Sequence, residues 1–362
     1  MTTQVAQDRP TRLTELLVAA ELDVLLVTGL VNVRYLTGYT GSNGLALVGP
    51  ELRRFVTDFR YAEQAAAEVD PSFDRIQAPV ELLDGLADAL PGGSLRLGFE
   101  AAHTSVTQHA FLREQLADSI ELAPTADLVE SLRAVKDAAE IASVRAATVL
   151  ADDSFERLLE DGLVGRSERE VAIALEHDMV LRGARRPSFD TIVAAGPHGA
   201  LPHAMPRDVE IREGDLVVID WGAQLDDYCS DCTRTVAAGE PGAEAREVYE
   251  LVLEAQQAGV DAVRADRPTA EVDGVARGII AAAGHGDNFG HGLGHGVGLD
   301  VHEAPWLRRR SDEVLQAGNV VTVEPGVYLV GRFGVRIEDL LAVTEDRAEI
   351  LTSVSKELIV SD

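Results

Sequence analysis

The chain has 362 residues, more than one typical hydrophobic core supports, so its length favours two domains. It is 46% hydrophobic and 26% charged, a composition typical of a soluble globular protein. Its formal net charge of −29 disfavours a nucleic-acid or anionic-membrane partner, because phosphate binding needs clustered cations.

The sequence also gives no sign of a membrane helix or a secretory signal. No apolar run reaches the roughly 18 residues that a membrane helix needs. The segment 1–23 lacks the order of basic start, apolar run and small-residue cleavage site that is typical of secretory signals. Two cysteines cannot build a disulfide framework, so we expect a cytoplasmic protein.

The first third of the chain predicts an α/β domain, because strand and helix patterns alternate along it. Short apolar runs predict strands at 22–30, 44–48, 53–57 and 95–99. Helical spacing occurs at 60–69, 80–90 and 109–116. A long helical pattern follows at 128–159, with Asp127 as its candidate cap. We therefore place the first domain at residues 1–126 and the second at residues 127–362.

The second domain continues with a helical pattern at 168–182, and beyond Gly183 strand patterns dominate. The strands are expected at 191–195, 215–219, 229–236, 319–323, 327–330 and 334–337. Helical patterns at 243–265 and 270–283 interrupt them. This order predicts an α+β domain in which helices cover a mostly antiparallel sheet.

Two expected hairpins in this domain bring acidic residues together. In the first hairpin, pairing the strands around Leu225 and Asp226 places Asp220 directly opposite Asp231. Both carboxylates belong to apolar strands, where facing like charges destabilise the pair and burial increases the cost. Either a shared proton or bound cations would relieve this repulsion.

The second hairpin repeats the arrangement. Its strands pair around Gly331, a good turn residue, and this register places Glu324 opposite Glu338. Four carboxylates directed at one site indicate two divalent metal ions.

A run rich in glycine and histidine, HGLGHGVGLDVHE at 291–303, lies between the two hairpins. It contains His291, His295 and His302. Imidazole suits Mn, Co, Zn or Fe, whereas Mg and Ca prefer oxygen ligands, so carboxylates with a histidine favour a transition metal. Each feature alone has an ordinary explanation, such as an edge residue or a flexible loop. The joint pattern in one domain carries the hypothesis.

In their order along the chain these residues resemble the five-ligand pattern of the pita-bread metallopeptidases, a family that includes methionine aminopeptidase, prolidase and aminopeptidase P. The strings VVIDWGAQLDDYCSDCTRT, HGLGHGVGLDVHE, VVTVEPGVY and GVRIEDL are similar to the prolidase and aminopeptidase P branch. VRYLTGYTGSNG and FVTDFRYAEQA resemble the non-catalytic first domain of bacterial aminopeptidase P-like enzymes, and LVESLRAVKDAAEIASVRAA resembles their domain junction. The resemblance covers nearly the whole chain. It implies a creatinase-like α/β domain followed by an α+β catalytic domain with the pita-bread (creatinase/aminopeptidase) fold.

The resemblance implies a role for each of the five ligands. Asp231 and Glu338 would bridge two metal ions, Asp220 would hold one of them, and His295 with Glu324 would hold the other. Bridged ions about 3.5–4 Å apart lower the pKa of a bound water toward roughly 7, which gives a hydroxide nucleophile, and they polarise the scissile carbonyl. Glu324 would also shuttle the proton to the leaving amine. Mn is the expected metal, with Co, Zn and Fe as alternatives.

Four further residues take roles by resemblance or position. His203 and His302 match histidines that bind substrate and stabilise the tetrahedral intermediate, and His291 matches a further pocket histidine. Arg336 lies two residues before Glu338 and so shares its strand face. We expect Arg336 to pair with an acidic ligand and to fix its orientation.

One other string is set aside. Cys229 and Cys232 form a C-x-x-C pattern, but residues three apart on an extended strand point to opposite faces. We therefore expect neither a chelate nor a disulfide from this pair.

The leading functional hypothesis is an Xaa-Pro aminopeptidase, which removes the first residue from peptides with proline in second position. The alternative is a prolidase, which accepts only Xaa-Pro dipeptides. The shared ligands do not separate the two, and the resemblance of the first domain favours the aminopeptidase. Methionine aminopeptidase normally lacks that domain, and the complete ligand set disfavours both a metal-free creatinase-like amidinohydrolase and a non-catalytic binding protein of the same fold. The resemblance also implies a homodimer.

Overall fold

The computed structural model describes residues 9–361. Residues 1–8, which belong to the segment considered above for a secretory signal, lie outside the described residues. The chain divides into two compact units, Met1–Arg133 and Ala134–Asp362, and each has its own hydrophobic core. Within residues 9–361, no helix combines the length and apolar character needed to cross a membrane.

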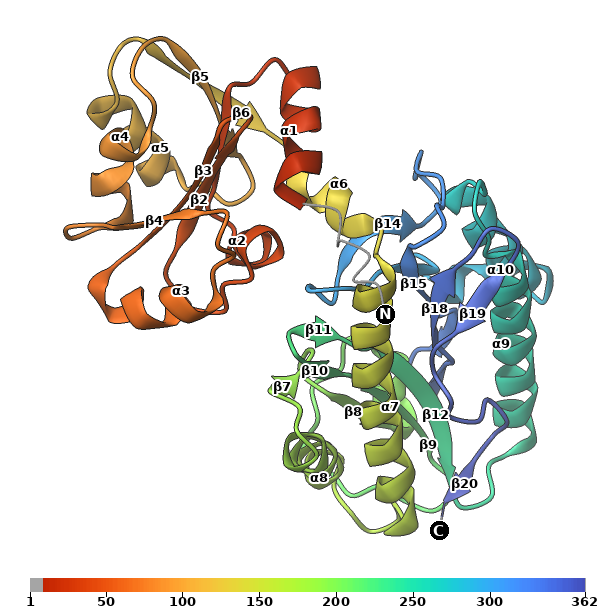
Figure 1. The fold of residues 1–362 in the computed structure, drawn as a ribbon. Coiled ribbons are helices and arrows are strands. Elements are labelled where there is room, and N and C mark those ends of the chain that lie inside the picture. Colours follow the sequence, from red (N-terminus) through yellow and green to blue (C-terminus); the bar gives the residue numbers. More distant parts are fainter. Residues whose placement is uncertain (1–8, 362) are drawn as a thin grey trace, which may run out of the picture. The chain divides into compact units, whose positions relative to one another are not determined.

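The first unit is built on a six-stranded sheet (Figure 1) in the order β4–β3–β2–β1–β5–β6. Its strands are β1 (Val24–Val27), β2 (Leu45–Gly49), β3 (Leu52–Thr57), β4 (Asp74–Gln77), β5 (Leu95–Glu100) and β6 (Ile120–Thr125). Its helices are α1 (Arg9–Ala19), α2 (Leu30–Thr37), α3 (Ala62–Glu68), α4 (Leu86–Ala89) and α5 (Val106–Gln115), with 3-10 turns η1 (Phe59–Tyr61) and η2 (Leu82–Gly85). The pairs β1–β2 and β2–β3 are antiparallel and the other three are parallel. The predicted α/β layering is confirmed.

Several elements of this unit differ from the sequence prediction, and helices α1 and α2 were not predicted. The strand expected at 22–30 is β1 alone, because helix α2 already begins at Leu30. The strands β4 and β6 were not predicted, since both are edge strands without a continuous apolar run, β4 mostly exposed and β6 mostly half-buried. Residues 120–125, just before the domain boundary predicted after residue 126, therefore belong to the first sheet.

The long helix predicted at 128–159 is two helices, α6 (Leu128–Ala134) and α7 (Ala138–Glu160). Between them the Lys136 N–H donates to the Gly318 carbonyl at 2.8 Å instead of joining a helical ladder. Asp137 caps α7 by accepting from two backbone N–H groups. Asp127, the predicted cap, adopts a left-handed backbone with φ of 55°.

The second unit contains two larger sheets. One has the order β20–β12–β9–β8 and the other β14–β13–β15–β18–β19, and β12–β20 is the parallel pair within them. The strands are β8 (Ile192–Ala195), β9 (Leu216–Trp221), β12 (Cys232–Ala238), β13 (Gly294–Gly296), β14 (Glu303–Leu307), β15 (Val320–Val323), β18 (Asp339–Val343), β19 (Ala348–Ile350) and β20 (Val360–Ser361). Shorter ladders are formed by β7 (Arg186–Pro187), β10 (Ala223–Leu225) and β11 (Tyr228–Cys229), and by β16 (Gly326–Leu329) and β17 (Phe333–Arg336). The predicted, mostly antiparallel α+β arrangement is confirmed.

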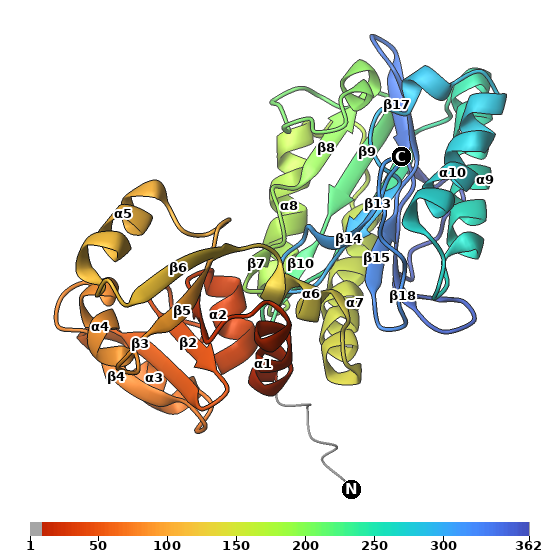
Figure 2. The same cartoon turned by 90° about the horizontal axis from the view of Figure 1, so that it is seen from above.

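Helices cover both sheets of this unit. Helix α7 and α8 (Glu168–Leu181) pack on the first sheet, where Phe155 stacks on Trp221 with ring centroids 4.0 Å apart. Helices α9 (Ala243–Ala262) and α10 (Thr269–Ala282) pack on the second sheet. Figures 1 and 2 show these two helix pairs against their sheets. The 3-10 turns η3 (Gly196–Ala200) and η4 (Gly286–Asn288) complete the unit.

Candidate metal centre

A cavity of about 470 Å³ in the second unit gathers the residues that the sequence singled out. All nine of them line it: Asp220, Asp231, His203, His291, His295, His302, Glu324, Arg336 and Glu338. The rest of the wall is largely apolar, with Phe189, Ile192 and Trp306, and it includes a second guanidinium, that of Arg308.

The register predicted for the first hairpin is wrong by two residues. Asp220 faces Thr233, and Asp231 lies just outside the ladder. The turn falls at Asp226 and Asp227, both in the left-handed region with φ of 48° and 66°, one residue later than predicted. Aspartate tolerates this backbone, and two-residue turns of this kind match the twist of paired strands. A slip of two residues preserves the side-chain face, so both aspartates still reach the cavity.

The register predicted for the second hairpin is correct. The β15–β18 ladder and the β16–β17 ladder continue the same residue pairing, with a short break between them. Glu324 and Glu338 lie opposite each other in that break. In that break the Glu324 N–H donates to the Leu293 carbonyl at 2.8 Å, and the Glu338 N–H donates to the Thr233 carbonyl at 3.1 Å. These bonds join the two acidic residues to the first hairpin and to the histidine run.

His295 sits on β13, a strand that the sequence did not predict. Its N–H donates to Thr322 Oγ1 at 3.1 Å, and its Nδ1 lies 3.1 Å from the Gly296 carbonyl. Donation from Nδ1 to that carbonyl leaves the Nε2 lone pair for a ligand. Nε2 lies 3.3 Å from Glu324 Oε1 and 3.6 Å from Asp231 Oδ2, so it points at the carboxylates.

The carboxylates perturb one another strongly. Burial, and then neighbouring carboxylates, hold the pKa of Asp231 and of Glu338 well above the ordinary range. Burial also raises the pKa of Asp220, against the opposing charge of Arg336. Burial disfavours the charged form of Glu324, but the hydrogen bond and attraction to His295 lower its pKa to about 2. Cations bound here would displace the protons held by the first three carboxyl groups.

The donor set fits divalent transition metals. Asp231, His295 and Glu338 each offer a ligand atom, and these atoms lie within 4.8 Å of one another. Asp220 Oδ1 is buried and has no hydrogen-bond partner among the described residues. A buried oxygen without a donor is costly, and a cation would satisfy it. Carboxylates with one imidazole match Mn, Co, Zn or Fe.

Behind these ligands lies a hydrogen-bonded network. Arg336 pairs with Asp220, as predicted, with Nη2 at 2.6 Å from Oδ2. Thr233 Oγ1 donates to Glu338 at 2.7 Å and accepts from Arg336 Nε at 3.0 Å. Tyr328 accepts from Arg336 Nη1 at 2.9 Å. The sequence reasoning missed Thr233 and Tyr328. The correct register would have identified Thr233, because it places this residue opposite Asp220.

The remaining predicted histidines, His203, His291 and His302, also line the cavity. The ring of His302 lies 4.3 Å from that of His295, and both burial and His295 lower the pKa of His302. His203 is exposed and lines the same cavity. Nε2 of His291 lies 2.9 Å from the Tyr328 hydroxyl, and burial lowers the pKa of His291.

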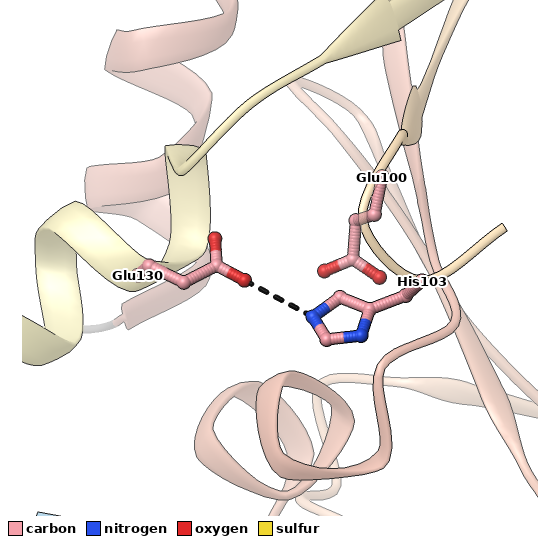
Figure 3. A group of neighbouring side chains, drawn as sticks. All are labelled: Glu100, His103 and Glu130. Atoms are coloured by element: carbon pink, nitrogen blue, oxygen red, sulfur yellow. Dashed lines mark hydrogen bonds and ion pairs between the residues drawn. The ribbon is translucent and has the colours of Figure 1, made fainter. Parts of the chain in front are cut away.

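The first unit contains a second histidine–carboxylate cluster (Figure 3), formed by Glu100, His103 and Glu130. The Glu100 carboxylate accepts hydrogen bonds from the Thr28 N–H at 2.6 Å, the Gly29 N–H at 2.7 Å and the Asn32 amide at 2.7 Å. The Asn32 amide also donates to Glu130 at 2.6 Å. Donors at the start of α2 thus already satisfy these oxygens, so we assign the cluster to capping that helix rather than to a metal.

The cysteines are both free thiols and both are buried. Burial raises the pKa of Cys229 to about 12.

Two family models match the chain. One, described as metallopeptidase family M24, matches residues 142–345, and the other, the creatinase/prolidase N-terminal domain, matches residues 9–135.

Similar proteins cover nearly the whole length of the chain. The solved Xaa-Pro dipeptidase from Bacillus anthracis has 40% sequence identity and a TM-score of 0.95, with 98% of this chain and 100% of that chain covered. The X-Pro aminopeptidase from Thermotoga maritima has 34% identity and a TM-score of 0.89 over the same shares. An Xaa-Pro dipeptidase from Pyrococcus horikoshii is 35% identical over 359 residues, 98% of this chain and 99% of the relative.

Proposed function

The chain belongs to metallopeptidase family M24, and we propose that within this family it is an Xaa-Pro dipeptidase. Its creatinase-type first domain and pita-bread catalytic domain are those predicted from the sequence. The sequence favoured the aminopeptidase and kept the dipeptidase as the alternative. The comparisons support the alternative, because the solved Xaa-Pro dipeptidase resembles this chain more than the solved X-Pro aminopeptidase does.

The observation that carries the proposal is a guanidinium in the same cavity as the carboxylate cluster. Arg308 lines the cavity, and its guanidinium carbon lies 5.4 Å from the centre of the Trp306 ring. A dipeptide carries its terminal carboxylate directly on the proline, and arginine binds carboxylates through paired hydrogen bonds. The other guanidinium of the cavity, Arg336, pairs with Asp220, so we assign the substrate carboxylate to Arg308.

We assign to Asp220, Asp231, His295, Glu324 and Glu338 the ligand atoms that would hold two divalent ions. Such ions activate water for attack on the scissile carbonyl and polarise that carbonyl. Manganese is the proposed metal, because it accepts both carboxylate and imidazole ligands.

The chain's own side chains bind the substrate and move the proton. Glu324 is ionised at neutral pH, because the hydrogen bond and attraction to His295 lower its pKa, and we assign it to take the proton of the attacking water. That proton then passes to the proline nitrogen as the C–N bond breaks. His302 is neutral at pH 7, since burial lowers its pKa, and its imidazole N–H donates to the substrate carbonyl oxygen. His203 donates to the same substrate, and the Phe189 side of the cavity receives the apolar proline ring.

A substrate panel on manganese-loaded protein tests this assignment. Ala-Pro should be cleaved with a higher kcat/KM than Ala-Pro amide or Ala-Pro-Ala, and Ala-Ala should be poor. Arg308→Ala should remove most of the preference for the free carboxylate. Arg310→Ala is the matched control, because Arg310 lies on the same loop but outside the cavity lining. Faster cleavage of Ala-Pro-Ala than of Ala-Pro would support the Xaa-Pro aminopeptidase instead.

The resemblance to this branch also supports two proposals about the whole protein. We propose that it forms a homodimer and that it works in the cytoplasm. Analytical sedimentation at the concentrations used for kinetics tests the first, and fractionation of the source cells tests the second.

A further inference from the structure

A single buried carboxylate, that of Glu168, joins both ends of a loop that lines the active-site cavity. Glu168 is the first residue of α8, and it is fully buried. Its Oε1 accepts from the Ala195 N–H at 3.0 Å and from Arg207 Nη2 at 3.0 Å. Its Oε2 accepts from the Arg207 N–H at 3.0 Å and from Arg207 Nε at 3.1 Å. His198 Nδ1 donates to the same carboxylate at 2.9 Å, so Glu168 ties residues 195–198 to Arg207.

The Glu168 carboxyl group keeps its charge despite its burial. Burial raises the pKa of Glu168, but the Arg207 guanidinium, two backbone N–H groups and His198 outweigh it, so the pKa lies below its ordinary value. An ionised carboxylate only accepts hydrogen bonds, and donors approach both of its oxygens here. Hydrogen bonds to a charged group are stronger than neutral ones. The positions of the donors at the two ends of the loop are therefore tightly coupled.

The loop between these ends carries His203. Four consecutive residues of the loop, 202–205, line the cavity. Among the residues that the structure describes, the His203 ring has no hydrogen-bond or ion-pair partner, so its position depends on the backbone that carries it. On one side of His203 the Pro202 carbonyl accepts from Arg336 Nη1 at 3.1 Å. On the other side, the next hydrogen-bonded residue described is Arg207, which Glu168 holds.

We propose that Glu168 is a positioning residue that, by joining the two ends of this loop, sets where His203 meets the substrate. The inference rests on the substrate-binding role proposed above for His203. The Arg169 N–H also donates to the Arg207 carbonyl at 3.1 Å, so this end of the loop stays beside α8 when Glu168 is changed. What is lost is the fixed spacing between Arg207 and residues 195–198, and with it the conformation of the segment that carries His203.

Glu168→Gln keeps the shape of the side chain and breaks the link. An amide has one acceptor oxygen, and its NH₂ group donates. Either orientation of the amide places this NH₂ group against donors, because donors approach both oxygens of Glu168. Glu170→Gln is the matched control, since it makes the same change two residues further along α8. Glu170 is exposed and accepts from the Ser167 N–H at 2.8 Å, a cap that glutamine also forms.

Histidine side-chain NMR on zinc-loaded protein tests the positioning directly, because Zn²⁺ has no unpaired electrons. The His203 resonances, assigned by their absence in His203→Ala, should shift in Glu168→Gln and stay unchanged in Glu170→Gln. If Glu168→Gln fails to fold, Arg207→Gln removes the charge from the partner, whose side chain is 46% exposed, and should shift the same resonances. Unchanged His203 resonances in the folded variant, or an equal shift in Glu170→Gln, would overturn the proposal whatever the activity.

Kinetics on the manganese-loaded full chain completes the test. Glu168→Gln should lower kcat/KM for Ala-Pro about tenfold at unchanged metal content, short of the roughly 10²–10³ lost with a whole oriented donor. In a His203→Ala background the same change should cost less than about twofold, because the group it positions is gone. A full additional loss in that background would contradict positioning through His203. Wild-type protein inactive on Xaa-Pro dipeptides would instead count against the proposed function, and the NMR result would still decide the role of Glu168.

Discussion

Two clusters in this chain bring a histidine and two carboxylates together, and their surroundings differ. We call them the metal cluster (Asp231, His295 and Glu338) and the cap cluster (Glu100, His103 and Glu130). In each, the potential ligand atoms lie within 4.8 Å of one another. Proximity therefore does not separate a metal site from a structural one.

The number of hydrogen-bond donors separates them. In the metal cluster, among the described residues, Asp231 is approached by one basic nitrogen, His295 Nε2 at 3.6 Å. In the cap cluster, Glu100 accepts from two backbone N–H groups and from Asn32. The start of helix α2 supplies free N–H groups, whereas paired strands have already used theirs. Glu338 of the metal cluster accepts from Thr233 alone among the side chains described, so this cluster has fewer donors than the cap cluster and favours a cation more strongly.

The largest loss of activity and of bound metal should follow from removing a negative charge in the metal cluster. Asp231→Asn keeps the shape but removes the carboxylate proposed as a metal ligand, so we expect loss of metal and of detectable turnover, and Asp231→Ala and Glu338→Ala should do the same. Elemental analysis and kcat on the same samples measure both. Near-normal turnover with both ions bound would remove that residue from the site.

The next effect concerns His302, which lines the cavity without being assigned to a metal. His302→Ala should lower kcat by about 10²–10³, the usual loss for one oriented donor, while both metals remain bound. His203→Ala should act similarly and also weaken substrate binding. Loss of metal in step with activity would make His302 a ligand and would count against His295.

The affinity for metal should depend strongly on the pH of the solution. Because the pKa values of Asp231 and Glu338 are raised, protons occupy these groups and must leave when a cation binds. Apparent affinity should therefore rise with pH, up to about tenfold per pH unit for each proton displaced. Calorimetry in buffers of different ionisation enthalpy counts those protons. An affinity that stays flat from pH 5 to pH 8 would contradict the raised pKa values.

The same groups set the pH dependence of stability for metal-stripped protein. A carboxyl group with a raised pKa binds its proton more tightly in the folded chain than in the unfolded chain. The group therefore contributes to folding stability fully below the ordinary carboxyl pKa of about 4. This contribution is lost as the pH rises through the raised pKa of the folded chain. Metal-stripped protein should thus lose stability with rising pH, and saturating Mn should reverse the loss. Thermal unfolding with and without metal measures it.

The sequence predicted the metal cluster better than the details of the fold around it. The four acidic residues and Arg336 could be found because hairpin pairing and side-chain alternation are local rules. The histidine-rich run pointed to His291, His295 and His302, and the family resemblance added His203 and supplied the roles. The first register failed because the turn depends on left-handed backbone at Asp226 and Asp227, which composition does not reveal. Arg308 escaped notice because only the folded loop places it in the cavity.

The cap cluster could not be predicted at all. Asn32 is 68 residues from Glu100 and 98 from Glu130 along the chain, and no motif joins them. Helix α2 was itself missed, so no N-terminus was available to explain a buried glutamate. Contacts of this separation depend on the packed sheet rather than on any local pattern.

The smallest expected effect is on stability and comes from the cap cluster. Removing a charge there should lower the free energy of unfolding, whereas removing one in the metal cluster should raise it. Glu100→Gln removes a charged acceptor from the start of α2, so the free energy of unfolding should fall by about 0.5–2 kcal/mol. At a pH above the raised pKa of Asp231, Asp231→Asn removes a repelling buried charge, so metal-stripped protein carrying it should there become more stable. Denaturant unfolding of both variants without metal compares the two, and His103→Ala is the control, since its loss should leave metal content and kcat unchanged. If Glu100→Gln lost bound metal while keeping its stability, the cap cluster would be a metal site, and donor count would not distinguish the two clusters.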